Sequence, residues 1–169
     1  MQKHVDYLDA IKLKFPEQVV IGIARDAAGK ANPIALGWTM ITSHKPPMMA
    51  VSIGLPRYSL EAFRAAEAFT IAMPSEHQAD ETMLFGTKSG RDMDKFAAAG
   101  TPLTAAAAID GVLMADAVAN FECVKRGEMT TGDHVLFVGE IVASHLNPDK
   151  PRRLYTLGTG FALGALDRR

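Results

Sequence analysis

The sequence predicts a mainly β protein, in which helices are inserted into a closed antiparallel barrel. Three observations point to this class. Segments rich in β-forming residues are separated by tight turns. The helical segments do not follow every strand, so the regular alternation of a parallel doubly wound sheet is missing. The last third of the chain is mostly strand, arranged around a Gly-Asp turn.

The first strands are expected from two apolar runs and the turns between them. Val19–Arg25 is β-rich, and residues 26–30 (Asp-Ala-Ala-Gly-Lys) have the composition of a hairpin turn. The partner strand is therefore expected over Asn32–Ser43. The Pro-Pro pair at residues 46–47 prevents a helix and imposes an extended corner, and Met48–Ile53 follows as a third strand.

The middle of the chain predicts three helices and one strand. Ser59 is expected to be the N-cap of the first helix, because its side chain can accept a hydrogen bond from a free backbone N–H. The expected order is a helix over residues 59–68, a strand over 69–73, a helix over 76–85, a polar loop over 86–92 and a helix over 93–99 that Gly100 ends.

The C-terminal part predicts a hairpin. Ala117–Lys125 alternates in hydrophobicity, Gly132 and Asp133 form the turn, and His134–His145 is the returning strand. The Gly-rich tail over Leu154–Leu166 is expected to be coil with local strand.

Length and composition restrict the function. The 169 residues suit one domain, 1–169, in which residues 1–14 form an N-terminal extension. The net charge of −1 gives no general attraction for nucleic acid, and no apolar run is long enough to cross a membrane. A single cysteine, Cys123, excludes an intrachain disulfide, so we expect a cytoplasmic protein.

Two loops are candidates for binding an anion. The turn Arg57-Tyr58-Ser59 precedes a predicted helix, whose free N–H groups favour an anion, and the arginine adds a fork that matches phosphate. The loop over Thr87–Asp92, followed by Lys95, combines hydroxyls, glycine and three cations. Taken alone, the first is better explained as an N-cap with a solvated arginine, and the second is equally a solvated loop at a helix entry. Two such loops in one domain nevertheless favour a phosphate site.

Trp38 and Asn32 are candidates for contacting the rest of a ligand. Trp38 is the only tryptophan and is either a packing residue or an aromatic wall for a ring system. Asn32 is either a turn residue or an amide directed at a ligand edge. The histidines have no metal-ligand spacing, and no nucleophile motif is present, so we expect neither a metal site nor a catalytic side chain.

A set of short motifs in a fixed order resembles the flavin reductase-like, FMN-binding split-barrel family, and flavoredoxin-type members most of all. The resemblance covers roughly residues 15–166. Its motifs are Asn32-x5-Trp38, Ser43-His-Lys-Pro-Pro, Ala50-Val-Ser-Ile-Gly, Arg57-Tyr-Ser, Gly86-Thr-Lys-Ser-Gly-Arg-Asp-Met-Asp-Lys-Phe96 and Gly132-Asp-His-x-Leu-Phe-Val-Gly-Glu140.

The resemblance implies a homodimeric split antiparallel β-barrel that holds FMN near the subunit interface. It places Asn32, Gly37, Trp38 and Thr39 along the flavin ring or ribityl chain, and Ser52, Ile53, Arg57, Tyr58 and Ser59 near the ring edge and phosphate. Ser89, Arg91 and Lys95 match the second phosphate loop, and His134 and Phe161 match residues close to the flavin. Ala35 departs from the pattern, because many relatives have a threonine there.

The function that follows is an FMN-dependent oxidoreductase of the flavin reductase type, in which NAD(P)H reduces the flavin and an acceptor takes the electrons. Two alternatives stay open. The first is a flavoredoxin-like electron carrier that receives electrons from a redox partner protein and has no NAD(P)H activity of its own. The second is a dimer that has lost flavin and binds another small ligand.

Overall fold

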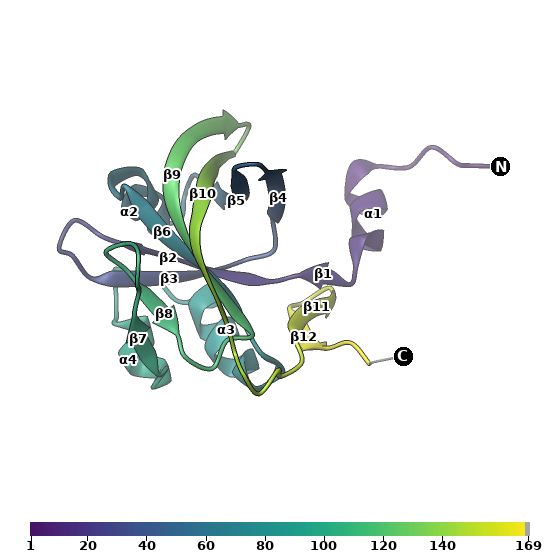
Figure 1. Ribbon diagram of the computed structural model, residues 1–169. Coiled ribbons are helices and arrows are strands. Elements are labelled where there is room, and N and C mark those ends of the chain that lie inside the picture. The colour runs from purple at the N-terminus through teal and green to yellow at the C-terminus, as the bar shows by residue number, and fades with distance from the viewer. Residues whose placement is uncertain (168–169) are drawn as a thin grey trace.

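The computed structural model describes residues 1–167, and its main element is a seven-stranded sheet (Figure 1). The strand order is β3-β2-β6-β9-β10-β5-β4, and every neighbouring pair is antiparallel. The strands are β2 (Val20–Arg25), β3 (Ala31–Leu36), β4 (Thr39–His44), β5 (Pro47–Gly54), β6 (Ala68–Met73), β9 (Ala119–Thr131) and β10 (His134–Leu146).

The remaining elements are short. Before the first strand the described chain has the helix α1 (Tyr7–Ile11) and the 3-10 helix η1 (Lys12–Lys14). Between later strands lie α2 (Ser59–Ala65), the 3-10 helix η2 (Glu76–Gln78), α3 (Ala79–Thr87) and α4 (Lys95–Ala99). Two small sheets complete the fold, one of β1 (Glu17–Gln18), β11 (Leu154–Gly158) and β12 (Ala162–Ala165), the other of β7 (Leu103–Ala105) and β8 (Val112–Met114).

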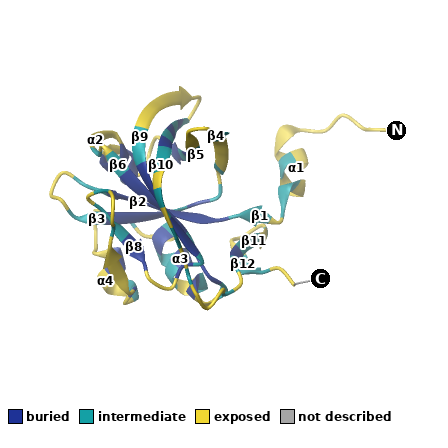
Figure 2. Cartoon of the chain, viewed as in Figure 1, coloured by how far each residue is buried: buried dark blue, intermediate teal, exposed yellow. Residues whose placement is uncertain are grey.

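Strand β2 lies inside the sheet, with apolar side chains buried on both of its faces (Figure 2). Successive side chains of a strand point to opposite faces. Val20 and Ala24 accordingly pack with Phe63 of α2, whereas Ile21 and Ile23 pack with the cluster that contains Phe85 of α3. The two apolar faces of β2 therefore hold α2 on one side of the sheet and α3 on the other.

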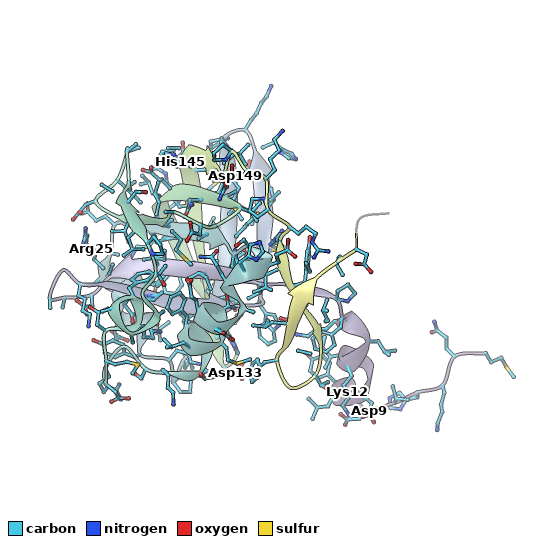
Figure 3. The ribbon with its side chains drawn as sticks, turned by 90° about the horizontal axis from the view of Figure 1, so that it is seen from below. Asp9, Lys12, Arg25, Asp133, His145 and Asp149 are labelled. Atoms are coloured by element: carbon cyan, nitrogen blue, oxygen red, sulfur yellow. The ribbon has the colours of Figure 1, made fainter. Side chains whose placement is uncertain are left out.

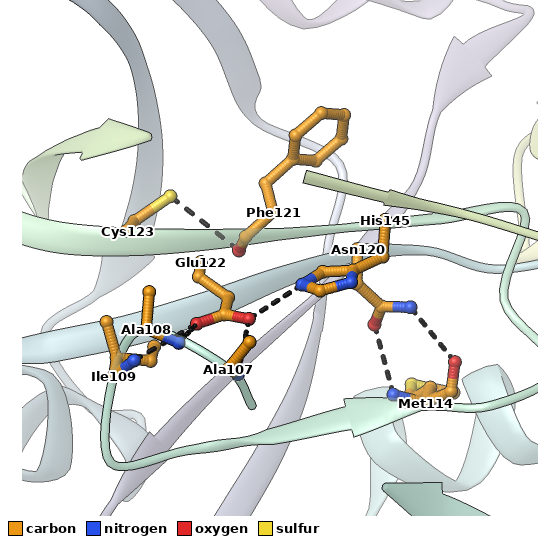
Figure 4. A network of polar contacts seen from close by, with 9 residues as sticks. All are labelled: Ala107, Ala108, Ile109, Met114, Asn120, Phe121, Glu122, Cys123 and His145. Atoms are coloured by element: carbon orange, nitrogen blue, oxygen red, sulfur yellow. Dashed lines mark hydrogen bonds and ion pairs between the residues drawn. The ribbon is translucent and has the colours of Figure 1, made fainter. Parts of the chain in front are cut away.

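The buried carboxylate of Glu122 on β9 holds the loop between β7 and β8 (Figure 4). It accepts hydrogen bonds from the backbone N–H groups of Ala107, Ala108 and Ile109, at 2.8, 2.6 and 3.0 Å. The ring of His145 on β10 lies 2.7 Å from the same carboxylate. All of these contacts join segments that are distant in sequence.

Several expectations from the sequence are confirmed. Residues 26–30 close the hairpin of β2 and β3, and β9 and β10 pair around a two-residue turn in which Gly132 has a φ of 65°. Gly100 ends α4 in the left-handed conformation, at a φ of 66°. Left-handed backbone favours glycine because it has no Cβ.

The strand expected over Asn32–Ser43 is wrong as a continuous element. It is broken at Gly37 and Trp38, and its halves β3 and β4 lie at opposite edges of the large sheet. Gly37 and Trp38 connect the two halves, and the Trp38 carbonyl accepts a hydrogen bond from Ser52 N of β5 at 2.9 Å. Closure into a barrel stays a prediction, because no ladder of hydrogen bonds joins β3 to β4 within residues 1–167.

The N-cap expected at Ser59 is also wrong. Tyr58 occupies the cap position with helical backbone angles and makes no side-chain cap hydrogen bond, while Ser59 lies inside α2. The segment Leu154–Leu166 contains more strand than expected, since β11 pairs with both β12 and β1. The short strands β7 and β8 carry little periodic signal, and the sequence did not predict them.

Helix α1 extends away from the sheet, as the labelled side chains of Asp9 and Lys12 show in Figure 3. These two residues form an exposed ion pair at 2.7 Å, and α1 has no buried residue. Within the described part of the chain, no helix is long and apolar enough to cross a membrane.

Candidate functional site

Two clefts meet where β3, the turn after β5 and the C-terminal end of α3 come together. The larger has a volume of about 400 Å³ and the smaller about 230 Å³. Ile34, Arg57, Gly86 and Thr87 line both, so the two clefts form one continuous site. A ligand can therefore extend from one cleft into the other.

The larger cleft is lined mostly by apolar, aromatic and small residues. Trp38 and Phe161 are exposed aromatic side chains in its wall. The Trp38 ring lies 4.6 Å from the ring of His134, between centroids, and Nδ1 of His134 lies 2.6 Å from the carboxylate of Asp133. Gly37 and Ala35 add little bulk. Such a surface suits a flat ring system that packs against aromatic side chains.

The smaller cleft is cationic. Four basic side chains line it together with the hydroxyls of two serines, and no aspartate or glutamate is found among the described residues of its lining. The basic residues are Arg57, Lys88, Arg91 and Lys95, and the serines are Ser59 and Ser89. None of the four cations forms an ion pair with a carboxylate within residues 1–167. This arrangement can hold an anion.

Lys95 is the cation at the bottom of the smaller cleft. Its side chain is 3% exposed, and its ammonium donates a hydrogen bond to the Phe85 carbonyl at 3.2 Å. Burial lowers the pKa of Lys95 to about 8, because removal from water disfavours the charged form. A buried cation without a carboxylate partner in the described chain favours an anionic ligand, which would restore the lost stabilisation of the charge.

Asn32 does not line the smaller cleft itself but is hydrogen-bonded to Ser59, which does. Its amide nitrogen donates a hydrogen bond of 2.8 Å to the hydroxyl of Ser59, and both residues are buried. Gly90 packs so closely on Asn32 that a Cβ at position 90 would lie 2.0 Å from Asn32 Oδ1. Glycine at this position therefore lets the loop after α3 approach β3.

The structure brings together eleven of the fourteen predicted site residues. Gly37, Trp38, Ser52, His134 and Phe161 line the larger cleft, Tyr58, Ser59, Ser89, Arg91 and Lys95 line the smaller one, and Arg57 lines both.

The other three predicted residues have different surroundings. Thr39 lines a third hollow of about 310 Å³, which adjoins the larger cleft through Gly37, Trp38 and Ser52. Its hydroxyl donates a hydrogen bond to the Ala50 carbonyl at 2.8 Å. Ile53 is fully buried in the hydrophobic core. Asn32 acts on the site through Ser59, as described above.

The sequence reasoning missed part of the lining. Lys88 stands in a loop that was recognised, but it was not singled out there. Thr82 and Met83 line the larger cleft from the middle of α3, and Lys14 and Phe15 line it from the N-terminal segment. No local pattern marks these residues, since only the packing of α3 and β1 against the cleft brings them there.

Ala35 and Gly86 make the close approach between β3 and α3. A Cβ at Gly86 would lie 3.4 Å from the Cβ of Ala35. Both residues line the larger cleft. The small residues at positions 35 and 86 therefore let strand β3 and helix α3 pack closely.

Comparisons with known proteins agree on one family. The sequence profile of the flavin reductase like domain matches residues 13–162. An uncharacterised protein from Archaeoglobus fulgidus is 30% identical over 67% of this chain and 64% of its own length. The NADH-dependent FMN reductase AsuE2 from Streptomyces nodosus subsp. asukaensis is 29% identical over 66% of this chain and 60% of its length. The matches thus span less than two thirds of both relatives.

The fold is also found among solved structures. Flavoredoxin of Desulfovibrio vulgaris (Miyazaki F) superposes with a TM-score of 0.86 at 22% sequence identity, covering 100% of this chain and 95% of flavoredoxin. The two proteins therefore share a fold.

Proposed function

Since the chain belongs to the flavin reductase like domain family, we propose that it binds FMN across the two connected clefts and works as an NAD(P)H-dependent oxidoreductase. One observation carries this proposal. An aromatic cleft of about 400 Å³ continues into a cationic cleft of about 230 Å³ whose described lining has no acidic residue. FMN matches these two clefts, because it has a flat ring system at one end and a phosphate dianion at the other.

The residues present fit this ligand. Lys95 is a buried cation that has no carboxylate partner in the described chain, and the phosphate would supply the missing negative charge. Arg57 and Arg91 line the same cleft and have the planar fork that matches phosphate oxygens. Asn32 orients the Ser59 hydroxyl at the cleft wall.

The residues of the larger cleft would hold and shield the ring. Trp38 and Phe161 offer aromatic faces, and the small residues Ala35, Gly37 and Gly86 add little bulk to the lining. When bound, FMN supplies the redox chemistry, which is acceptance of a hydride and transfer of its electrons to an acceptor. We assign no proton transfer to a side chain of the protein.

NAD(P)H as the reductant rests on the relatives. AsuE2 is named as an NADH-dependent FMN reductase, and the family is that of flavin reductases. Trp38 and Phe161 in the lining of the larger cleft are 45% and 65% exposed, so their rings are accessible from solvent.

Absorbance spectroscopy followed by a reductant assay tests the proposal. We expect the purified protein to bind added FMN with a shift of the flavin absorbance, and then to accelerate NADH or NADPH oxidation above the rate with free FMN. FMN binding without faster oxidation would instead identify an electron carrier. A protein that leaves the FMN spectrum unchanged would overturn the proposal.

We also propose that the protein is a homodimer. Strand β4 is an edge strand, and its Met40 and Ile41 side chains are 52% and 64% exposed. Exposed apolar residues on an unpaired edge favour association with another chain. Sedimentation analysis is expected to give twice the monomer mass of 18.2 kDa, and replacement of Ile41 by lysine is expected to shift the species to the monomer.

A further inference from the structure

Two buried threonine hydroxyls have no hydrogen-bond partner within residues 1–167, Oγ1 of Thr82 and Oγ1 of Thr70. Thr82 in α3 is 2% exposed, and Thr70 in β6 is 1% exposed. A hydroxyl that is removed from water and left unpaired raises the free energy of the fold. The two differ in their surroundings, because Thr82 lines the larger cleft, whereas Thr70 lines neither of the two clefts nor the hollow at Thr39.

The position of Thr82 in its helix explains why its hydroxyl is unpaired. A threonine inside a helix can donate its hydroxyl to the carbonyl four residues earlier, and Thr87 of the same helix does so, to Met83 at 2.8 Å. For Thr82 that carbonyl belongs to Gln78, which precedes α3 and has non-helical backbone angles, φ −101° and ψ 25°. The regular helix thus does not include the carbonyl that would serve Thr82.

Helix α3 runs along both clefts. Thr82 lines only the larger cleft, Gly86 and Thr87 line both, and Lys88, directly after the helix, lines only the smaller one. The six steps from Thr82 to Lys88 correspond to a rise of about 9 Å along a helix axis. Thr82 therefore lies at the ring end of the proposed site, nearly two helical turns away from the cationic loop.

The residues beside Thr82 leave room for a ligand. Gly86 comes four positions later and so lies on the same side of the helix. Its neighbour on β3 is Ala35, whose Cβ would lie 3.4 Å from a Cβ at position 86. All three residues line the larger cleft. Thr82 therefore supplies a polar group next to two residues whose side chains supply none.

We propose that the Thr82 hydroxyl forms a hydrogen bond with the part of the flavin that lies outside its phosphate, either a heteroatom of the ring or a hydroxyl of the ribityl chain. The inference rests on the proposed FMN site and adds a contact that does not involve the phosphate. A helical threonine has two populated χ1 rotamers, so the hydroxyl can turn toward the cleft when a partner is bound. Binding would then pair a group that the free protein leaves unpaired.

Three substitutions separate this contact from a structural role. T82V replaces the hydroxyl by a methyl group of similar shape, and T82S keeps the hydroxyl. The matched control is T70V, which removes the other buried unpaired hydroxyl at a position outside the clefts. Affinities for FMN and riboflavin are measured by titration of flavin fluorescence, and the stability of the flavin-free proteins is measured by urea denaturation.

We expect T82V to weaken the binding of FMN and of riboflavin by the same factor, about 2- to 12-fold, which corresponds to one neutral hydrogen bond. T82S should keep most of the wild-type affinity, and T70V all of it. R91A should instead weaken the binding of FMN alone, because riboflavin has no phosphate for the smaller cleft. Lumiflavin, which has the ring without the ribityl chain, identifies the bonded part. An equal loss in T82V assigns the bond to the ring, and no loss assigns it to the chain.

Urea denaturation supplies the readout that a structural role would change. Because the hydroxyl is unpaired in the free protein, its removal should leave the urea midpoint of flavin-free T82V unchanged or raise it, as in T70V. At one fixed FMN concentration the midpoint should rise less for T82V than for wild type and T70V, because weaker binding stabilises the fold less.

Two results would overturn the Thr82 contact while the proposed function stands. The first is a flavin affinity of T82V equal to that of the wild type. The second is a urea midpoint of flavin-free T82V well below that of T70V, which would show that the hydroxyl has a partner inside the fold. Failure of the wild type to bind any flavin would overturn the proposed function and the contact together.

Discussion

Asn32 Nδ2 donates a hydrogen bond of 2.8 Å to Ser59 Oγ, joining two buried side chains that are 27 residues apart. This bond links edge strand β3 to the first turn of α2, at the wall of the cationic cleft. Gly90 packs on the other side of the Asn32 amide. The loop that carries Ser89 and Arg91 is therefore placed by its contact with Asn32.

Replacement of Gly90 by alanine should disturb this junction. The new Cβ would lie 2.0 Å from Asn32 Oδ1, and the buried amide has little room to move away. We expect G90A to lower the free energy of unfolding by about 1–3 kcal/mol and to weaken FMN binding. Urea denaturation measures the first effect.

A double mutant checks the cause. N32A removes the clashing amide, so the stability loss in N32A/G90A should be smaller than the sum of the losses in the two single variants. Simple additivity would show that Gly90 acts through some other contact.

The affinity for FMN should fall as the pH rises above about 8. The pKa of Lys95 in the free protein is lowered to about 8 by burial, and a bound phosphate dianion would raise it again. Above pH 8, binding must then take up a proton, so affinity decreases by up to about tenfold per pH unit. Fluorescence titrations between pH 7 and pH 9.5 measure this slope.

Two controls accompany the pH series. K95R keeps its charge throughout this range and should give a flatter profile, and riboflavin, which lacks the phosphate, should show no such slope. The stability of the free protein should change in the opposite direction. Between about pH 8 and 10.5 the unfolded lysine holds more protons than the folded one, so stability rises with pH. A pH-independent FMN affinity would remove Lys95 from the phosphate site.

Glu122 should be required for the stability of the fold. E122Q places an amide where three backbone N–H groups and His145 now meet a carboxylate, so at least one buried donor loses its partner (Figure 4). We expect a loss of at least about 2 kcal/mol in the free energy of unfolding. E61Q, at an exposed carboxylate paired with Arg64, is the matched control and should be nearly neutral.

The same carboxylate predicts sensitivity to acid. Burial raises the pKa of Glu122, but its hydrogen bonds with the three amides and His145 outweigh burial and hold the pKa below its usual value of 4.5. A lowered carboxyl pKa stabilises the fold above the unfolded value, and this stability is lost as the pH falls through the folded one. Wild type should thus lose stability below about pH 4.5 more steeply than E122Q.

Cys123 should be unreactive in the folded protein. Burial, and then the charge of the neighbouring Glu122, raise the pKa of its thiol to about 12, and the thiolate is the reactive form. An aromatic disulfide reagent at pH 8 should therefore modify one thiol per chain in denaturant and none in buffer. Rapid labelling of the native protein would show that β9 opens readily.

Local residue patterns predicted much of the fold. Alternation and turn chemistry located β2, the β9–β10 hairpin and the end of α4 at Gly100. They did not locate the break at Gly37 and Trp38, because both halves of the segment are strand-like and only their pairing with β2 and β5 separates them. The wrong N-cap at Ser59 has a similar cause, since its hydroxyl accepts from the distant Asn32.

The parts of the candidate site that consist of consecutive residues could be predicted from the sequence. The two basic loops are short runs in the sequence, and the structure places them around one cleft. Thr82 and Lys14 enter the larger cleft only through the packing of α3 and the N-terminal segment, so no spacing rule identifies them. Ile53 was named with its neighbours, but alternation along β5 directs it into the core, whereas Ser52 faces the cleft.

The most direct test of the two-cleft FMN site is an equilibrium titration of the wild-type protein with FMN and with riboflavin, followed by the fluorescence of the single tryptophan, Trp38. The account predicts saturable quenching at one FMN per chain, because Trp38 lines the ring cleft. It also predicts that riboflavin binds at least about tenfold more weakly, because riboflavin lacks the phosphate and cannot form its charged hydrogen bonds with the protein. Equal affinity for the two flavins, or no saturable quenching by FMN, would contradict it.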